Sequence, residues 1–196
     1  LLDADKAYRA RVRLGVTTTT GDAEGEVIVE KPPVTDRVLI DAALARVRGE
    51  ICQVPPMYSA LKRDGKPLYE YARAGVELER EARTVVIYDL QVIVLEGNFF
   101  DIEIRCSKGT YIRTLAADIG EVLGCGASLS ALTRTGVGPL SLSDPPVRTL
   151  EALAALSADE LPECLMPVDM LAANLPKLTL DAADRKSTRL NSSHSS

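Results

Sequence analysis

The chain has 196 residues, and its 46% hydrophobic and 26% charged content is ordinary for a soluble globular protein of one domain or slightly more. No apolar run approaches the ~20 residues that a membrane span needs, and no basic-then-apolar signal peptide opens the chain. Residues 185–196 hold three of the 23 basic residues and none of the 28 acidic ones, so the rest of the chain carries a net charge of −8. That charge disfavours a general nucleic-acid binder, and such a role would depend on a local patch.

Cysteine and histidine usage narrows the possible chemistry. Cys52, Cys106, Cys125 and Cys164 are widely spaced without a C-x-x-C pair, which predicts reduced, buried thiols in a cytoplasmic protein. The one histidine, His194, is nearly the last residue. Unless the tail folds into the body, the sequence excludes most metal sites and every Ser-His or Cys-His mechanism.

The first predicted element is a strand over residues 6–15. One side of it carries Tyr8 and three aliphatic residues, and the other side carries Arg9, Arg11 and Arg13. A stripe of arginines on a strand is usually a solvated face, and this is the favoured interpretation of the stripe taken alone.

Turn-forming residues follow, with a loop predicted over 17–25 and a short strand over 26–30. Thr35 or Asp36 can then cap a helix that Gly49 closes.

The next stretch combines prolines, a tyrosine and cations. Residues 53–62 lack clear periodicity, which predicts an ordered extended segment or loop. Pro67 suits the first turn of a helix over 68–73, and Gly75 ends that helix.

The second half of the chain is more regular. A β-branched strand over 84–95 turns back into a strand over 98–106, and a further strand is predicted over 127–134. A short helix over 150–156 follows, capped by Thr149.

Strands outnumber helices and hairpins link them, which predicts an α+β fold around a mixed, mostly antiparallel sheet. We expect the strands that start at Lys6, Glu26, Thr84, Asn98 and Ala127 to join one sheet. The helix that starts near residue 110 should pack on one face of it.

The most informative stretch is the sequence SKGTYIRT at 107–114, where the two-residue rhythm of a strand gives way to a helical one. Gly109 lets the backbone bend or approach a ligand closely, while Tyr111 and Arg113 fall near the first helical turn. A tyrosine offers a flat face and a hydroxyl, and an arginine offers a fork of donors for a carboxylate or phosphate. Taken alone, Tyr111 is best explained as a core residue and Arg113 as a solvated one. Together at this junction they favour a functional site.

The common catalytic motifs, including the P-loop, G-x-G-x-x-G, H-E-x-x-H and G-x-S-x-G, are missing from the sequence. What remains is a set of tyrosines and arginines on strands or at strand ends, which suits stacking of a flat base and binding of an anion. The set comprises Tyr8, Tyr58, Tyr111, Arg113 and Arg134.

Five sequence blocks, in order, resemble the TruB family of tRNA pseudouridine synthases. They include DKAYR near the start, QVPPMYSALK in the middle, CSKGTYIR at the junction and GCGA leading to LTR. The blocks lie at 5–15, 18–25, 53–73, 106–113 and 124–134. Thr19 departs from the acidic or other polar residue that members often carry there, but it lies in a loop.

The resemblance implies an activity on tRNA. The T-loop uridine at position 55 would be flipped into a pocket, where an aspartate breaks the glycosidic bond and the base rejoins through carbon. Carried over by motif, Tyr8 stacks on the flipped base, Tyr111 and Leu132 line the pocket, and Arg113 orients the nucleophilic aspartate. The arginine stripe beside Tyr8 would then contact RNA phosphates. We expect no metal or organic cofactor, no membrane partner, and a monomer.

The family's nucleophile lies in a motif upstream of the Tyr8 block, so it would fall before Leu1. We therefore expect an internal fragment, with the catalytic domain over 1–140, a further synthase segment over 141–184, and no RNA-binding PUA domain. We expect Arg113 to lack its carboxylate partner, which would lower stability. Residues 185–196 resemble a foreign, disordered tail that contacts the body little.

Two other interpretations stay open. A pocket without a nucleophile could belong to a non-catalytic RNA-binding module or tRNA chaperone. Alternatively, the chain is a generic α+β domain whose tyrosines belong to the core, although five ordered motifs would then be coincidental. If the isolated chain were active, Asp22 would be the first nucleophile to examine.

Overall fold

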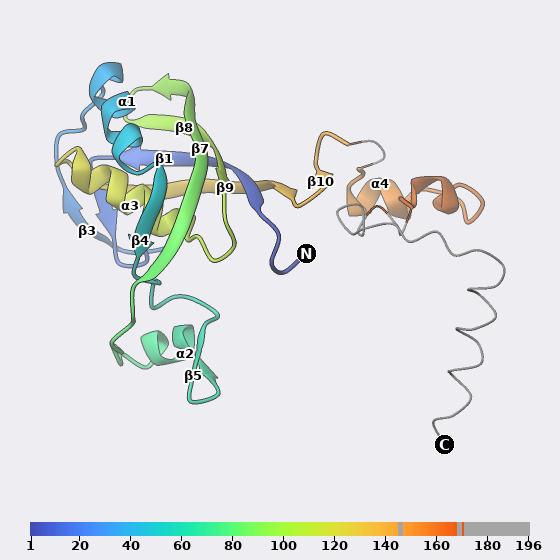
Figure 1. Cartoon of the computed structure of the whole chain (residues 1–196), viewed down its shortest axis with the longest axis horizontal. Coiled ribbons are helices and arrows are strands. Elements are labelled where there is room, and N and C mark those ends of the chain that lie inside the picture. The colour runs from blue at the N-terminus through green and yellow to red at the C-terminus, as the bar shows by residue number, and fades with distance from the viewer. Residues whose placement is uncertain (145–146, 168–169, 171–196) are drawn as a thin grey trace, which may run out of the picture. The chain divides into compact units, whose positions relative to one another are not determined.

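The candidate site lies in the first of two compact units, which spans Leu1–Val147; the second unit begins at Arg148. The computed structural model describes residues 1–144, 147–167 and 170. The first unit is built on a six-stranded sheet in the order β10-β9-β1-β8-β7-β4 (Figure 1). Its strands are β1 (Lys6–Leu14), β4 (Gly49–Gln53), β7 (Arg83–Glu96), β8 (Phe99–Cys106), β9 (Ala127–Val137) and β10 (Leu140–Ser141). Every ladder between these strands is antiparallel, which confirms the predicted α+β class with a mostly antiparallel sheet.

The alternation predicted for the first strand is present in β1. Tyr8, Ala10 and the two aliphatic residues that follow on the same side are buried. Ala10 lies opposite Ile102 of β8 and Leu132 of β9, so β1 is an inner strand with both edges occupied.

Two helices cover the core face of the sheet, α1 (Arg37–Arg46) and α3 (Ile112–Val122). Ile40 of α1 and Leu115 of α3 are fully buried in the same cluster as the apolar side of β1. Asp36 caps α1 as predicted, because its carboxylate accepts two backbone N–H groups of the first turn at 2.7 and 3.3 Å. The three- and four-residue spacing that predicted α3 therefore corresponds to a buried apolar stripe.

The strand predicted near residue 26 does not join the main sheet, and that expectation is wrong. Instead β2 (Val16–Thr18) and β3 (Val27–Glu30) pair with each other in a separate two-stranded sheet. Both edges of β1 are already occupied, and Gly15, with a φ of 80°, turns the chain away after β1. All four residues of β3 are exposed, so β3 has no buried face with which to enter the sheet.

The chain between β4 and β7 forms a small lobe at the end of the sheet where β4 stops (Figure 1). The sequence did not predict β4, a short edge strand without clear alternation. Of the loop predicted over 53–62, residues 54–61 have neither helix nor strand, whereas Gln53 ends β4 and Lys62 begins β5. The lobe continues with β5 (Lys62–Arg63), β6 (Lys66–Pro67) and α2 (Leu68–Arg73), and the last confirms the predicted helix.

The described part of the second unit contains α4 (Leu150–Ala154) and a 3-10 helix, η1 (Leu161–Cys164). The predicted cap of α4 is confirmed, because the Thr149 hydroxyl accepts a backbone N–H at 3.2 Å. Residues 185–196, with His194, lie outside the described residues. Among the helices that are described, none is both long and apolar enough to cross a membrane.

The prediction of buried cysteines holds for two of the four. Cys106 and Cys125 are buried, whereas Cys52 is exposed and Cys164 is half-buried. Cys52 is exposed because it lies on edge strand β4, between two residues that point to the other face. All four are free thiols.

Gly120 is the glycine of the first unit at which an added Cβ would come closest to neighbouring backbone. An added Cβ would overlap the backbone of Gly126 and Ala127, at the turn from α3 into β9. We expect Gly120→Ala to lower the free energy of unfolding by about 3 kcal/mol, because neither backbone segment can move without disturbing the core. Urea denaturation followed by circular dichroism measures this change.

The matched control is Gly97→Ala, in the open turn between β7 and β8. Nothing lies within 4 Å of an added Cβ there, and only the positive φ of 59° opposes the substitution. The expected loss is about 1–2 kcal/mol. Equal losses at both positions would show that α3 can move away from β9.

Candidate active site

The junction between β8 and α3 presents Tyr111 and Arg113 at the start of a helix, as the sequence predicted. The Thr110 hydroxyl donates to the Ser107 carbonyl at 2.9 Å, and the Ser107 hydroxyl accepts a backbone N–H of β7 at 2.9 Å. Gly109 has a φ of 82°, a left-handed conformation that favours glycine. The local sequence therefore fixes the turn that places Arg113 in the first turn of α3.

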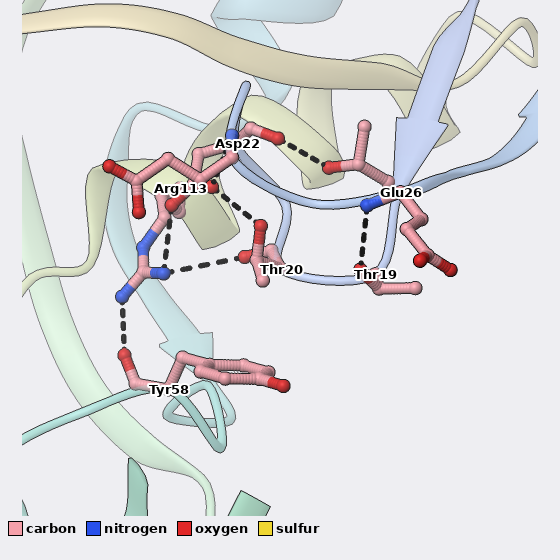
Figure 2. A network of polar contacts seen from close by, with 8 residues as sticks. Thr19, Thr20, Asp22, Glu26, Tyr58 and Arg113 are labelled. Atoms are coloured by element: carbon pink, nitrogen blue, oxygen red, sulfur yellow. Dashed lines mark hydrogen bonds and ion pairs between the residues drawn. The ribbon is translucent and has the colours of Figure 1, made fainter. Parts of the chain in front are cut away.

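Arg113 is the centre of a polar network that joins three segments of the chain (Figure 2). Its Nη1 donates to Asp22 Oδ2 at 2.9 Å and to the Thr20 carbonyl at 3.4 Å, while Nη2 donates to the Tyr58 carbonyl. The Arg113 and Asp22 side chains are 24% and 22% exposed, so solvent screens their ion pair only in part. The prediction that Arg113 lacks a carboxylate partner is wrong, because Asp22 supplies one, and the expected loss of stability no longer follows.

The loop between β2 and β3 orients Asp22 toward the arginine. The Thr20 hydroxyl donates to Asp22 Oδ1 at 2.5 Å, and the Glu24 backbone N–H donates to the same oxygen at 3.2 Å. The Thr18 hydroxyl donates to the Asp22 carbonyl at 2.7 Å. Oδ2 is therefore turned to Arg113. Sequence reasoning missed this role, although the threonines next to an aspartate in a glycine-containing turn were its signal.

An open hollow of about 680 Å³ surrounds this network. Tyr58, Tyr69 and Arg73 from the lobe face it together with Arg113, and the Arg73 guanidinium lies 5.3 Å from the centre of the Tyr69 ring. The remaining lining residues come from the loop after β2 and from the lobe: Thr19, Thr20, Asp22, Glu24, Gly25, Glu26, Ser59 and Ala60. Flat rings and guanidinium groups of this kind suit a nucleotide base and its phosphate.

The other predicted site residues lie outside that hollow's lining. Tyr8 is on the core face of β1, 8% exposed, with the Arg134 guanidinium 5.5 Å from its ring centre. Leu132 lies opposite Ala10 on the same face and is 46% exposed, so this end of the core face is open to solvent. The structure thus brings Tyr8, Leu132 and Arg134 together on two strands, and Tyr111 together with Arg113 at the start of α3.

The arginine stripe of β1 has carboxylate partners on the face of the sheet opposite the core. Arg9 and Arg11 approach Asp101 of β8 at 3.6 and 3.3 Å, and Arg11 also pairs with Glu96 at 3.0 Å. Arg13 lies over the Phe99 ring at 6.0 Å. These contacts favour the interpretation of a solvated, internally paired face over the suggested use against phosphate.

Asp118, a half-buried residue of α3, is the carboxyl group most altered by its surroundings. Burial and the charge of Glu121 raise the pKa of Asp118 to about 6, and a hydrogen bond from Gln53 acts in the opposite direction. Among the described residues, no group of three or more His, Cys, Asp and Glu side chains could hold a metal ion.

The raised pKa of Asp118 predicts a pH-dependent stability. The protonated carboxyl favours the folded state, so its contribution is complete below about pH 4 and is lost as the pH rises through about 6. We compare the free energies of unfolding of Asp118→Asn and the parent at two pH values. Between pH 4 and pH 7.5 the difference should shift in favour of Asp118→Asn by about 1 kcal/mol. This value is reduced because Asp118 is partly in contact with solvent. Urea unfolding at both pH values measures the difference, and a pH-independent difference would contradict it.

Comparisons with known proteins agree with this geometry. The family model described as TruB family pseudouridylate synthase (N terminal domain) matches residues 1–112, and that of the tRNA pseudouridylate synthase B C-terminal domain matches residues 113–173. The sheet, the junction and these matches together define a pseudouridylate synthase domain. Within this class, the chain belongs to the TruB family.

Individual relatives are similar over most of the chain. The tRNA pseudouridine synthase B of Azoarcus sp. strain BH72 is 57% identical over 184 residues, which is 94% of this chain and 61% of the relative. The protein of the same name from Chromobacterium violaceum is 57% identical over 180 residues, 92% of this chain and 58% of the relative. The chain therefore spans about three-fifths of these relatives' length.

Among solved structures, a chain of a Cbf5-Nop10-Gar1 complex superposes with a TM-score of 0.62 and 27% identity. The match covers 87% of this chain and 44% of that one. A chain from an H/ACA RNP bound to a substrate RNA that contains 2′-deoxyuridine has a TM-score of 0.57 at 23% identity, a likeness of fold alone. It covers 87% of this chain and 42% of that one.

Proposed function

We propose that this chain contributes the catalytic domain of a tRNA pseudouridine synthase that converts the T-loop uridine at position 55 to pseudouridine. Membership of the TruB family, together with similarity to relatives named tRNA pseudouridine synthase B, supports this proposal. The observation that carries it is Arg113, held at a strand-to-helix junction by Asp22 and facing a hollow of nucleotide size.

The reaction is an isomerisation and needs no metal or organic cofactor. The uridine leaves the RNA stack, its C1′–N1 bond breaks, the uracil rotates, and a C1′–C5 bond forms. N1 gains a proton, and the hydrogen on C5 is released to solvent. The family's motif would place the nucleophilic aspartate upstream of the block that contains Tyr8.

The residues of this chain would bind the extruded base and orient the nucleophilic carboxylate. Tyr8 would stack on the extruded base, while Tyr111 and Leu132 line its pocket. Arg113, anchored by Asp22, would orient the nucleophilic carboxylate, because a guanidinium presents donors on more than one edge.

The catalytic domain would occupy residues 1–140, followed by a synthase segment over 141–184. The protein would act as a monomer in the cytoplasm, with tRNA as its partner.

Release of tritium from tRNA labelled at C5 of uridine 55 tests this function, because only C5 glycosylation displaces that hydrogen. The full-length gene product should release one equivalent of tritium, and the 196-residue chain should release none. Tight tRNA binding by the full-length gene product without release would instead support the RNA-binding module or chaperone. Release by the 196-residue chain alone would show that the nucleophile lies within it, with Asp22 the first residue to replace.

A further inference from the structure

Gln53 is a buried amide beside Asp118, and it does not line the hollow around Arg113. It is the last residue of edge strand β4, and it is 2% exposed. Among the described residues it is the largest buried polar side chain; the others are Thr18, Ser59 and Ser128. A buried amide is costly unless its hydrogen-bonding groups find partners.

Both ends of the Gln53 amide bind one backbone residue, Tyr111, 58 residues away in sequence. Its Oε1 accepts the Tyr111 N–H at 3.0 Å, and its Nε2 donates to the Tyr111 carbonyl at 3.3 Å. This reciprocal pair fixes the positions of the two peptide groups on either side of the Tyr111 Cα, directly before α3.

The same two segments of chain meet at a second point. Directly after Gln53, residues 54–61 carry Tyr58, whose carbonyl accepts a hydrogen bond from Arg113 Nη2. Gln53 therefore joins the backbone at the start of α3 to the segment that contacts the Arg113 side chain. Two attachments between two segments restrict relative rotation, which a single attachment does not.

We propose that Gln53 is a positioning residue that holds the start of α3, and with it Tyr111 and Arg113, in the geometry needed for turnover. The proposal rests on the proposed function above. Gln53 would act through Arg113 without touching the RNA. Small displacements of an orienting group lower the rate strongly even when the substrate still binds.

The test replaces Gln53 with leucine in the full-length gene product. Leucine preserves most of the volume but neither hydrogen bond to Tyr111. We expect the single-turnover rate of tritium release at saturating tRNA to fall at least roughly 10-fold, with tRNA affinity within about 3-fold of the parent. The control is Ile40→Val, a fully buried change in α1 that lowers the melting temperature but should leave the rate unchanged.

A second variant separates positioning from folding, since Gln53→Leu also leaves buried Tyr111 groups unpaired. In Gln53→Glu the introduced carboxyl can donate to the Tyr111 carbonyl only when it is protonated. The charged residues beside it are Asp118 on α3, on which Glu121 acts in turn, and Arg83, the register partner on β7. We expect its rate, divided by that of the parent at the same pH, to rise as the pH falls from 8 to 6.

The outcomes are distinguishable. If Gln53→Leu loses no more rate than Ile40→Val, or if the Gln53→Glu ratio does not change with pH, Gln53 only stabilises the core and the proposal is overturned. If Gln53→Leu fails to fold, the pH response of Gln53→Glu decides. If the parent protein binds tRNA but releases no tritium, the proposed function is contradicted, and the proposed role of Gln53 is contradicted with it.

Discussion

Replacing Arg113 with alanine in the full-length gene product should lower the rate of pseudouridine formation by roughly 10²- to 10³-fold. The guanidinium is held by Asp22 and by the carbonyls of Thr20 and Tyr58, so its position is fixed before substrate arrives. The variant should still fold, because the pair is near the surface and Asp22 keeps its hydrogen bonds from the β2–β3 loop. Single-turnover tritium release measures the rate.

Arg9→Ala is the matched control for the Arg113 substitution. Arg9 also pairs with an aspartate, at 3.6 Å from Asp101, but on the opposite face of the sheet. We expect its rate to stay within about 2-fold of the parent, as for an exposed ion pair without contact to substrate. Equal effects of the two substitutions would mean that the site is not at the α3 junction.

Replacing Tyr8 with leucine should have the second largest effect, a loss of roughly 10²-fold in rate. Leucine fills most of the buried space but offers no flat ring on which a base can stack. Tyr8→Phe should keep most of the rate, because the face of the ring is preserved. The same tritium assay measures both variants.

Phe100→Leu provides the control for lost aromatic packing. Phe100 is fully buried on β8, opposite Val12 of β1, and faces the same core. Phe100→Leu should lower the free energy of unfolding by about 1 kcal/mol, as Tyr8→Leu should, but without a comparable loss of rate. If both leucine variants lose the same rate, Tyr8 is a core residue and the generic-domain interpretation regains its weight.

Elements defined by neighbouring residues were predictable from the sequence. Alternation predicted β1, a cap at Thr35 or Asp36 predicted the start of α1, and the change of period at 107–114 predicted the junction. Each depends on interactions within a few residues, which a sequence pattern records directly.

Pairings over long distances were not predictable in the same way. The pattern of β3 is that of a strand, but it does not show that the edges of β1 are already taken. The Arg113–Asp22 pair joins residues 91 apart, and the Gln53–Tyr111 pair joins residues 58 apart. Nothing in either local sequence specifies the partner, so these contacts required the structure.

The place of β1 inside the sheet also has a consequence for folding during synthesis. Its two neighbours come much later in the chain, since β8 starts at Phe99 and β9 ends at Val137. Until both have left the ribosome, β1 lacks at least one of its neighbouring strands and the core cannot close. Folding of this unit is therefore governed by distant pairings, which are slow to form, and the waiting strand is exposed to aggregation and to chaperones in the meantime.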